Sequence, residues 1–319
     1  MDETILHAVA DQALGATRKL DLKVGFRCNN HCTFCVQGDK RDHTADLTTD
    51  EVKERLEKAR SQCDRLVLTG GEATIRDDIP EIAKHARSLG YHTIQLQTNG
   101  RRLAYRNYCE TLIAAGVNRF NPSIHGHIAS LHDKLTGSRG AFDQAIRGIQ
   151  NLVALRQIVL TQTVIVRDNV PHLPEIAQLL VQLGVVQVQF AFVHAIGTAA
   201  ATWDETVPRY RDVAPQVAIA VDRVRAARRT AVTEAIPFCF LHGRETAACE
   251  LRTPSTMVYD GQITIGDYGK YRFEEGKIRG PVCETCTWNV RCEGPWREYP
   301  ARFGWEEFVA RTDPPLPVT

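Results

Sequence analysis

The sequence has little net charge and no long hydrophobic run. Its 319 residues carry 39 Lys and Arg against 38 Asp and Glu, a formal net charge of +1, so it lacks the basic excess of proteins that bind nucleic acid or anionic membranes. The most apolar stretch, residues 179–201, is interrupted by Gln182, Gln187, Gln189 and His194, which excludes a transmembrane helix of about 20 apolar residues. The first residues also lack the basic and then apolar layout of a secretory signal peptide. We therefore expect a cytoplasmic protein that binds neither nucleic acid nor membrane.

Cysteine is the residue type present in excess. The composition, 43% hydrophobic and 24% charged, is otherwise that of an ordinary globular protein. In a reducing compartment its ten cysteines should be thiols, metal ligands or catalysts rather than disulfides. Six of them form two tight groups near opposite ends of the chain: Cys28, Cys32 and Cys35, and Cys283, Cys286 and Cys292. Such grouping is typical of a metal-binding protein.

Apolar runs of strand length alternate with helical patterns between about residues 20 and 205. Strands are predicted at 21–27, 65–69, 93–98, 118–124, 158–166 and 185–193, with helices between them. Thr48 and Glu51 form a capping box that predicts the start of the first helix. Strands that alternate with helices predict a parallel sheet. Such a sheet is either open and doubly wound, or closed into a complete or partial barrel.

Amides occupy alternate positions in three of the predicted strands. They are Gln95, Gln97, Asn121 and Gln189, and their strand neighbours are apolar. A parallel strand covered by helices on both faces would be apolar almost throughout. The alternation therefore favours a barrel whose lumen holds a polar ligand, with these four amides as candidates for its lining. The alternative is that the amides satisfy one another across the sheet.

The pattern changes after about residue 205. A long helix is predicted at about 208–229, followed by two short β segments joined by Asp260 and Gly261, which together indicate a hairpin. The second cysteine group follows this hairpin. We therefore divide the chain into an N-terminal extension (1–20), an α/β domain (21–205) and a C-terminal region with a linker helix and a metal-binding domain (206–319).

The first cysteine group directly follows the first predicted strand, with the spacing C-x3-C-x2-C. Three thiolates alone do not complete a four-coordinate zinc site. They can bind three irons of a [4Fe–4S] cluster and leave the fourth iron open for another ligand. Three unrelated thiols, or zinc with His31 or His43 as a further ligand, are the alternatives.

This spacing resembles that of the radical S-adenosylmethionine (radical SAM) superfamily, in which C-x3-C-x-aromatic-C ends the first strand of a β/α barrel. Gly70, Gly71 and Glu72 end the second predicted strand and resemble the Gly-Gly-Glu motif of that superfamily. Residues 98–100 and 123–126 end the next two strands in a similar style. The resemblance spans about residues 20–205 and implies a partial (β/α)6 barrel.

The resemblance also implies the cofactors and the chemistry. Cys28, Cys32 and Cys35 would bind a [4Fe–4S] cluster whose open iron chelates S-adenosylmethionine (SAM). One electron, from a reductant such as flavodoxin or ferredoxin, would cleave SAM to a 5′-deoxyadenosyl radical that removes a hydrogen atom from the substrate. The protein would orient the reactants and exclude water and oxygen.

Seven residues are implied to contact SAM. They are Phe34 at the adenine, Gly70, Gly71 and Glu72 at the amino group, and Ser123, Asn99 and His125 along the methionine and ribose. Ser123 and His125 could instead be polar residues satisfied within the barrel.

The second cysteine group, C-x2-C-x5-C, resembles the auxiliary-cluster extensions called SPASM and twitch domains. The SPASM pattern continues with a fourth cysteine where this chain has Trp296, so we expect one auxiliary [4Fe–4S] cluster rather than two. The fourth ligand would come from upstream. We favour Cys239, which follows an extended apolar segment with a proline, over Cys249, which lies between charged residues. Zinc is the alternative metal.

The substrate class stays open at this point. Enzymes with this layout modify ribosomally made peptides by crosslinking, oxidation or epimerisation, or oxidise small molecules in biosynthetic pathways, and we favour the peptide. Because only about 20 residues precede the first strand, a leader-binding domain is not expected, and a separate peptide-recognition protein could take its place. A non-catalytic iron–sulfur redox sensor is disfavoured by residues 70–72 and the polar lumen. An RNA-modifying enzyme is disfavoured by the low net charge.

Overall fold

A nine-stranded sheet runs through residues 18–315, the part of the chain that the computed structural model describes. The strand order is β7-β6-β5-β4-β3-β2-β1-β8-β9, and every pairing is parallel except that of β8 with β9. The strands are β1 (Lys19–Lys23), β2 (Arg65–Thr69), β3 (Thr93–Thr98), β4 (Arg119–Pro122), β5 (Ile158–Ile165), β6 (Gln187–Phe192), β7 (Thr230–Glu234), β8 (Thr256–Asp260) and β9 (Ile263–Ile265). Most of the expected N-terminal extension, residues 1–17, lies outside the described residues.

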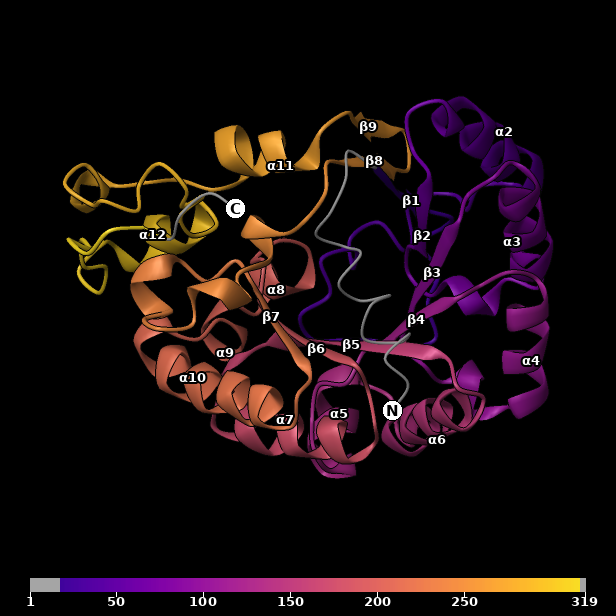
Figure 1. The fold of residues 1–319 in the computed structure, drawn as a ribbon, viewed down its shortest axis with the longest axis horizontal. Coiled ribbons are helices and arrows are strands. Elements are labelled where there is room, and N and C mark those ends of the chain that lie inside the picture. The colour runs from indigo at the N-terminus through magenta and orange to yellow at the C-terminus, as the bar shows by residue number, and fades with distance from the viewer. Residues whose placement is uncertain (1–17, 316–319) are drawn as a thin grey trace.

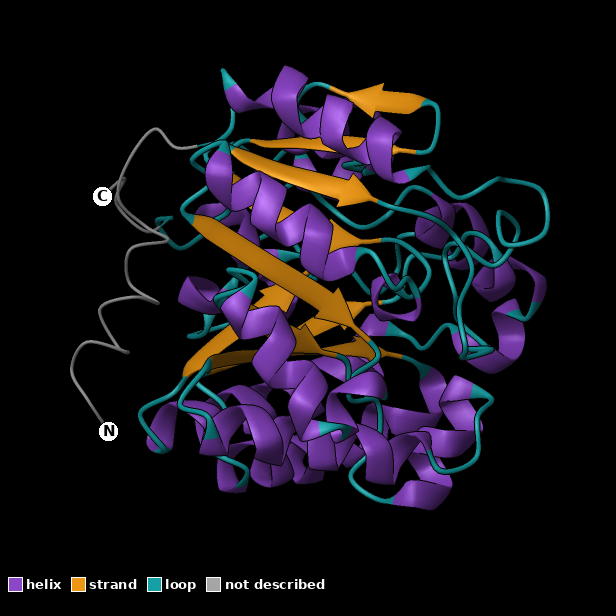
Figure 2. Ribbon diagram, turned by 90° about the vertical axis from the view of Figure 1, so that its right-hand side faces the viewer, coloured by secondary structure: helices purple, strands orange, loops and turns teal. Residues whose placement is uncertain are grey.

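The helices cover the outer side of the curved sheet (Figures 1 and 2). They are α2 (Thr49–Arg60), α3 (Ile79–Ser88), α4 (Arg106–Ala114), α5 (Ala129–Thr136), α6 (Ala141–Ala154), α7 (Leu173–Gln182), α8 (Thr198–Ala201), α9 (Trp203–Thr206), α10 (Tyr210–Ala226), α11 (Tyr268–Tyr271) and α12 (Glu298–Phe303). The architecture is the partial β/α barrel that the sequence predicts. None of these helices is both long enough and apolar enough to span a membrane.

One hydrophobic core fills the space between the sheet and the helices. The strands contribute side chains with no exposed surface, among them Leu20, Leu22, Leu66, Leu68, Ile94 and Leu96. Helix α2 begins at the predicted capping box, in which Glu51 N donates to Thr48 Oγ1 (3.2 Å) and Thr48 N donates to Glu51 Oε2 (2.7 Å). Its apolar face buries Val52 and Leu56 in this core.

Several elements differ from the sequence-based expectation, among them the first strand, which was predicted at 21–27 and is observed at Lys19–Lys23. The helix predicted to reach residue 229 ends at Ala226, and Thr230–Glu234 forms a further parallel strand beside β6. The hairpin around Asp260 and Gly261 forms as β8 and β9, but β8 also pairs in parallel with β1. Helix α5 was not predicted, because its eight residues carry few apolar side chains. The sheet therefore extends past the six expected strands at both edges.

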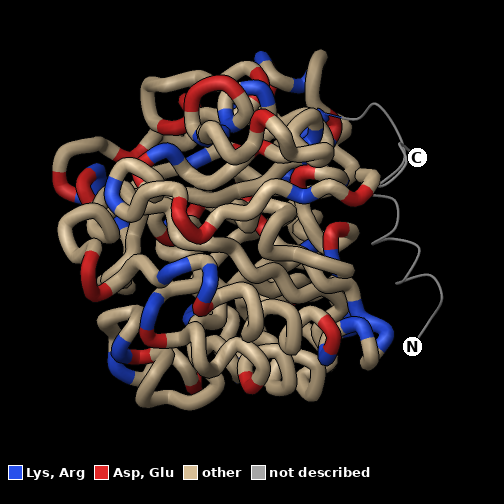
Figure 3. The backbone as a smooth tube through the Cα atoms, turned by 90° about the vertical axis from the view of Figure 1, so that its left-hand side faces the viewer, with Lys and Arg blue, Asp and Glu red and all other residues tan. Residues whose placement is uncertain are grey.

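Positions of Lys and Arg and positions of Asp and Glu are interspersed along the backbone in the view of Figure 3, in keeping with the net charge of +1. Many of them form surface ion pairs, such as Lys58 with Glu54 and Arg106 with Glu110. Pairs of this kind contribute little stability individually, about 0.3–0.5 kcal/mol. The fold is therefore held mainly by its apolar core.

Candidate functional site

The first cysteine group lies on the loop that follows β1, at the carboxyl edge of the sheet. Cys28, Cys32 and Cys35 are each half-buried and none forms a disulfide. Burial raises the pKa of the Cys32 thiol to about 12, and the nearby Cys35 and Cys28 add to this rise. Burial also raises the pKa of Cys28, although the Asn30 backbone N–H, 3.4 Å from its sulfur, opposes the shift. The three sulfurs therefore share one small region of the loop.

The Gly-Gly-Glu segment after β2 packs directly against the start of this loop. Gly71 N donates to Gly25 O (2.9 Å), and Glu72 N donates to Arg27 O (2.8 Å). A Cβ on Gly70, whose φ is +144°, would lie 2.1 Å from Gly25 O, and a Cβ on Gly71 would lie 2.3 Å from Arg27 O. Only glycine therefore allows the two segments to approach so closely. This contact fixes the Gly-Gly-Glu segment against the loop that carries the first cysteine group.

Glu72 joins the ends of β2 and β3. Its side chain is buried, and Oε1 accepts from Thr74 N (2.9 Å), Thr74 Oγ1 (2.6 Å) and Thr98 Oγ1 (2.6 Å). Oε2 accepts from Asn99 N (2.5 Å). Because four donors of the chain already bind this carboxylate, Glu72 positions the neighbouring backbone rather than offering a free charge.

Side chains after β3 hold the residues between Cys28 and Cys32. Asn99 Nδ2 donates to Asn29 Oδ1 (2.6 Å). Arg101 donates to the Asn29 carbonyl and to Asn30 Oδ1 (3.1 Å). Sequence reasoning missed Asn29, Asn30 and Arg101, since only the fold brings them together. Asn99, expected to line the SAM site, therefore contacts the cysteine loop.

The loop is also fixed at the end of α5 and at the start of α8. His31 N donates to Thr136 O (2.8 Å), and Thr33 N donates to Leu135 O (3.1 Å). On the other side, Thr198 N donates to Cys35 O (3.0 Å). The whole stretch from residue 31 to residue 35 is thus bound to neighbouring elements.

Phe34 and His125 pack together at this edge. The Phe34 ring is buried, and its centroid lies 4.7 Å from that of His125 in an edge-on arrangement. His125 Nδ1 accepts from Val164 N (3.2 Å), and its backbone N–H donates to His132 Nδ1 (3.1 Å). Burial lowers the pKa of His125 well below its usual value. His125 is therefore neutral and bonded within the chain, where it supports the ring of Phe34.

The predicted amides lie on the sheet face opposite the apolar core. Ser123, half-buried after β4, donates its backbone N–H to Thr98 O (2.9 Å) and forms a bridge with Gln162. Gln97 of β3 pairs with Asn121 of β4 in the sheet. The Gln97 side chain reaches past β4 to β5, where its Nε2 donates to Gln162 Oε1 (3.1 Å). The Oδ1 atom of Asn121 is buried and has no partner among the described residues.

The row of polar groups continues toward β7. Gln162 pairs with Gln189 in the sheet, and Gln189 Nε2 donates to Glu234 Oε2 (2.6 Å). Gln95 lies farther from the carboxyl end of β3 than Gln97 does, and it pairs with Arg119 of β4. The sequence analysis missed Gln162 and Glu234, because β5 reads as mostly apolar and β7 was not predicted.

The second cysteine group lies close to Cys239. Burial raises the pKa of Cys239 to about 12, and Cys292, Cys283 and Cys286 add to the rise. Cys249 is surrounded by charged side chains instead, with its sulfur 3.5 Å from Glu250 Oε2. Cys239 therefore lies within electrostatic range of the triplet, whereas charged side chains rather than other cysteines act on Cys249.

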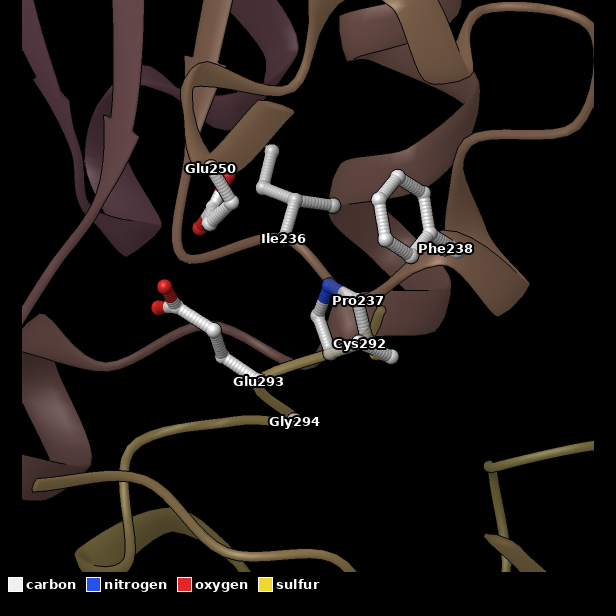
Figure 4. Close-up of a pocket in the computed structure, with 7 residues that line it drawn as sticks. All are labelled: Ile236, Pro237, Phe238, Glu250, Cys292, Glu293 and Gly294. Atoms are coloured by element: carbon white, nitrogen blue, oxygen red, sulfur yellow. The ribbon is translucent and has the colours of Figure 1, made fainter. Parts of the chain in front are cut away.

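Buried ion pairs lie beside Cys292. Lys277 Nζ is 2.8 Å from Glu250 Oε1 and 2.7 Å from Glu293 Oε2, and Arg272 binds Glu293 through two nitrogens (2.9 and 3.0 Å). Figure 4 shows the two carboxylates on one side of a small pocket that Cys292 also lines. Mutual pairing keeps these four side chains charged although they are buried.

Trp296 occupies the position where the SPASM pattern has its next cysteine. Its ring stacks on His194, with centroids 3.8 Å apart and planes at 7°. Lys277 Nζ lies 5.1 Å from the centre of the same ring. The residue in place of the cysteine therefore packs the C-terminal region against the loop that follows β6.

The donor atoms of both cysteine groups fit iron–sulfur clusters. Within residues 18–315, no three His, Cys, Asp or Glu side chains lie close enough together to hold a single metal ion. A [4Fe–4S] cluster takes thiolate ligands on separate irons, and N–H groups near the sulfurs tune it. Such N–H groups are present, since Arg311 N lies 3.4 Å from Cys286 Sγ and Asn30 N approaches Cys28 Sγ.

A comparison with protein families decides the assignment. The model of the Radical SAM superfamily matches residues 22–191, more than half of the chain. The chain belongs to the radical SAM superfamily. Membership implies SAM and a [4Fe–4S] cluster as cofactors, and a reductant and a substrate as partners.

Curated relatives resemble this radical SAM protein over about half of its length. An AdoMet-dependent heme synthase of Oleidesulfovibrio alaskensis is 31% identical over 171 residues, which is 53% of this chain and 44% of the relative. A probable GTP 3′,8-cyclase of Saccharolobus islandicus is 30% identical over 173 residues, 53% of this chain and 55% of the relative. The chain spans about half the length of the curated relatives it matches.

Solved structures share the fold over nearly the whole radical SAM chain. Streptococcus suis SuiB bound to precursor peptide SuiA has a TM-score of 0.63 at 14% identity, covering 97% of this chain and 79% of that chain. Native anSMEcpe with bound AdoMet also has a TM-score of 0.63 at 14% identity, covering 92% and 93%. At this identity the likeness concerns the fold alone.

Proposed function

We propose that this radical SAM enzyme binds its [4Fe–4S] cluster through Cys28, Cys32 and Cys35 and modifies a ribosomally made peptide. The observation that carries the proposal is the gathering of these three sulfurs on a loop bonded to the Gly-Gly-Glu segment. When bound and reduced, the cluster supplies the electron that cleaves SAM to a 5′-deoxyadenosyl radical. We propose flavodoxin or ferredoxin as the electron donor and, from the many free thiols, the reducing cytoplasm as the location.

The chain's own groups would orient SAM beside the cluster. The amino group of SAM donates hydrogen bonds, so Gly70 and Gly71 would hold it through their carbonyl oxygens. The amide hydrogens of Gly71 and Glu72 are bonded to the cysteine loop. Phe34 would stack near the adenine, and Ser123 would line the ribose side. Asn99 and His125, which bond within the chain, would position these neighbours.

The row of polar groups in the lumen is the proposed substrate wall. Gln95, Gln97, Asn121 and Gln189 offer hydrogen-bonding groups on the face opposite the core, as a peptide backbone requires. SuiB, which shares the fold, is known with its precursor peptide SuiA. A small molecule from a biosynthetic pathway is the second candidate, because the heme synthase and the GTP cyclase, more similar in sequence, are named for the small molecules heme and GTP.

The cluster assignment is tested by cysteine replacement. Anaerobically reconstituted wild-type protein, reduced with dithionite, should release 5′-deoxyadenosine from SAM, and the variant with Ala at Cys28, Cys32 and Cys35 should not. Cys109→Ala, which removes a thiol buried under α4, is the matched control and should keep the activity. Release from the triple variant at the wild-type rate would refute the assignment.

An auxiliary [4Fe–4S] cluster on Cys239, Cys283, Cys286 and Cys292 is the second part of the proposal. Four thiolates would close this cluster, so that it conducts an electron rather than binding substrate. Wild-type protein should then carry about eight irons. Cys239→Ala should lose or weaken the second set, whereas Cys249→Ala should not. About four irons in fully reconstituted wild type, or zinc at this site, would contradict it.

The substrate class is tested by turnover. Synthetic peptides encoded by genes beside this one, mixed with SAM and dithionite, should raise 5′-deoxyadenosine formation above the substrate-free rate and should change in mass. A porphyrin or a nucleotide that does so while the peptides do not would establish the small-molecule alternative.

A further inference from the structure

Arg41 lies against the stretch between the first two cysteines of the SAM-binding group. Its Nη2 donates to the carbonyl of Asn30 at 2.7 Å, two residues from Cys28 and two from Cys32. Arg101 holds the same stretch from the end of β3. Two guanidinium groups therefore hold Asn29 and Asn30 in this loop.

The charge of Arg41 is not neutralised by a carboxylate within residues 18–315. Arg27 is paired with Asp46 and Lys40 with Asp260 (2.7 Å), whereas neither Arg41 nor Arg101 forms an ion pair with a described residue.

An unpaired cation so close to the cysteine loop would stabilise the oxidised and the reduced cluster by different amounts. Three thiolates already make the site anionic, and reduction adds one more negative charge. A nearby positive charge stabilises the more negative state by the larger amount. The half-buried position of Arg41 limits screening of this interaction by salt.

We propose that Arg41 is a positioning residue whose guanidinium supplies the counter-charge of the SAM-binding cluster and raises its reduction potential. Arg41 would affect the step in which the oxidised cluster takes up one electron, which dithionite supplies in the assay. The inference rests on the proposed assignment of Cys28, Cys32 and Cys35 as its ligands. Arg101 contributes to the shape of the loop.

The test is a redox titration followed by electron paramagnetic resonance. The SAM-binding cluster is recognised as the one whose signal changes when SAM is added, and the titration itself is run without SAM. Arg41→Met should keep the wild-type iron content and show a more negative midpoint potential. Arg41→Lys, which keeps the charge, should stay close to wild type.

Arg55→Met is the matched control. Arg55 is also a half-buried guanidinium bound to one carbonyl, that of Gly261 at 2.8 Å, so its replacement makes the same change of net charge on another element. Its midpoint potential should equal that of wild type. If Arg41→Met takes up less iron, Arg41→Gln, which retains a donor for the Asn30 carbonyl, is titrated in its place.

Three results would overturn the proposal. The first is an Arg41→Met variant with full iron content whose midpoint potential equals that of wild type. The second is a shift of the midpoint potential in Arg41→Lys as large as that in Arg41→Met. The third is a shift that appears only when SAM is present. The last would mean that Arg41 binds SAM instead. A wrong cluster assignment can be told apart from a wrong role for Arg41. If the assignment were wrong, the variant with Ala at Cys28, Cys32 and Cys35 would keep the paramagnetic resonance signal that changes when SAM is added.

Discussion

Among single residues, Glu72 combines burial with an unusually complete set of donors. Gln in its place keeps the shape but offers one acceptor oxygen and an NH2 group that would face N–H or O–H donors. We expect Glu72→Gln to lower the unfolding free energy of the cluster-free protein by about 1–3 kcal/mol, measured by urea denaturation. Glu81→Gln, which breaks only the exposed pair with Lys53, should cost less than about 1 kcal/mol. Equal losses would contradict this role for Glu72.

A second residue, His132, makes the unfolding free energy of the protein depend on pH. Burial lowers its pKa from 6.5 to about 4, so the unfolded chain binds a proton that the folded chain does not. The contribution of neutral His132 is complete above pH 6.5 and is lost as the pH falls toward 4. Between pH 7 and pH 5, we expect wild type to lose about 2 kcal/mol more unfolding free energy than His132→Asn. Asn can accept the same hydrogen bond from His125 N, and parallel pH profiles would rule the effect out.

Among the elements, the short helix α5 supports the cysteine loop at its C-terminal end. Gly137 ends this helix with φ +60°, and a Cβ there would lie 2.4 Å from His31 O, inside the cysteine loop. We expect Gly137→Ala to cost more than the roughly 1 kcal/mol of left-handed strain and to reduce iron uptake. Gly140→Ala is the control, because its φ is +77° and nothing lies within 4 Å. Denaturation and iron analysis of both variants check this, and equal effects would mean that α5 does not hold the loop.

At the scale of the whole molecule, residues after 205 complete the barrel sheet and its core. Strand β8 covers the edge of β1, and Asp260 at its end binds Lys23 and Lys40, each at 2.7 Å. Tyr210 of α10 is buried against Phe240 and Tyr299. We therefore expect a chain ending at residue 205 to lack a cooperative thermal transition, followed by circular dichroism, while the full chain unfolds cooperatively. A sharp transition in the shorter chain would show that the barrel folds alone.

Local signals in the sequence predicted several elements. The pattern of apolar and polar residues located β2 and β3 at their observed bounds, the Thr48 and Glu51 pair located the start of α2, and the cysteine spacing marked the candidate clusters. The position of Gly70 and Gly71 after β2 was also readable, but their close contact with the backbone of residues 25–27 was not.

The way in which distant segments meet depended on the folded chain. The parallel pairing of β8 with β1 and the contact of Arg41 with the Asn30 carbonyl join residues that are far apart in the chain or lie on irregular loops. Local periodicity carries no information about such contacts, since a loop's direction is fixed by the elements packed around it. The sequence therefore determined which groups could hold a cluster, and the fold decided which of them lie together.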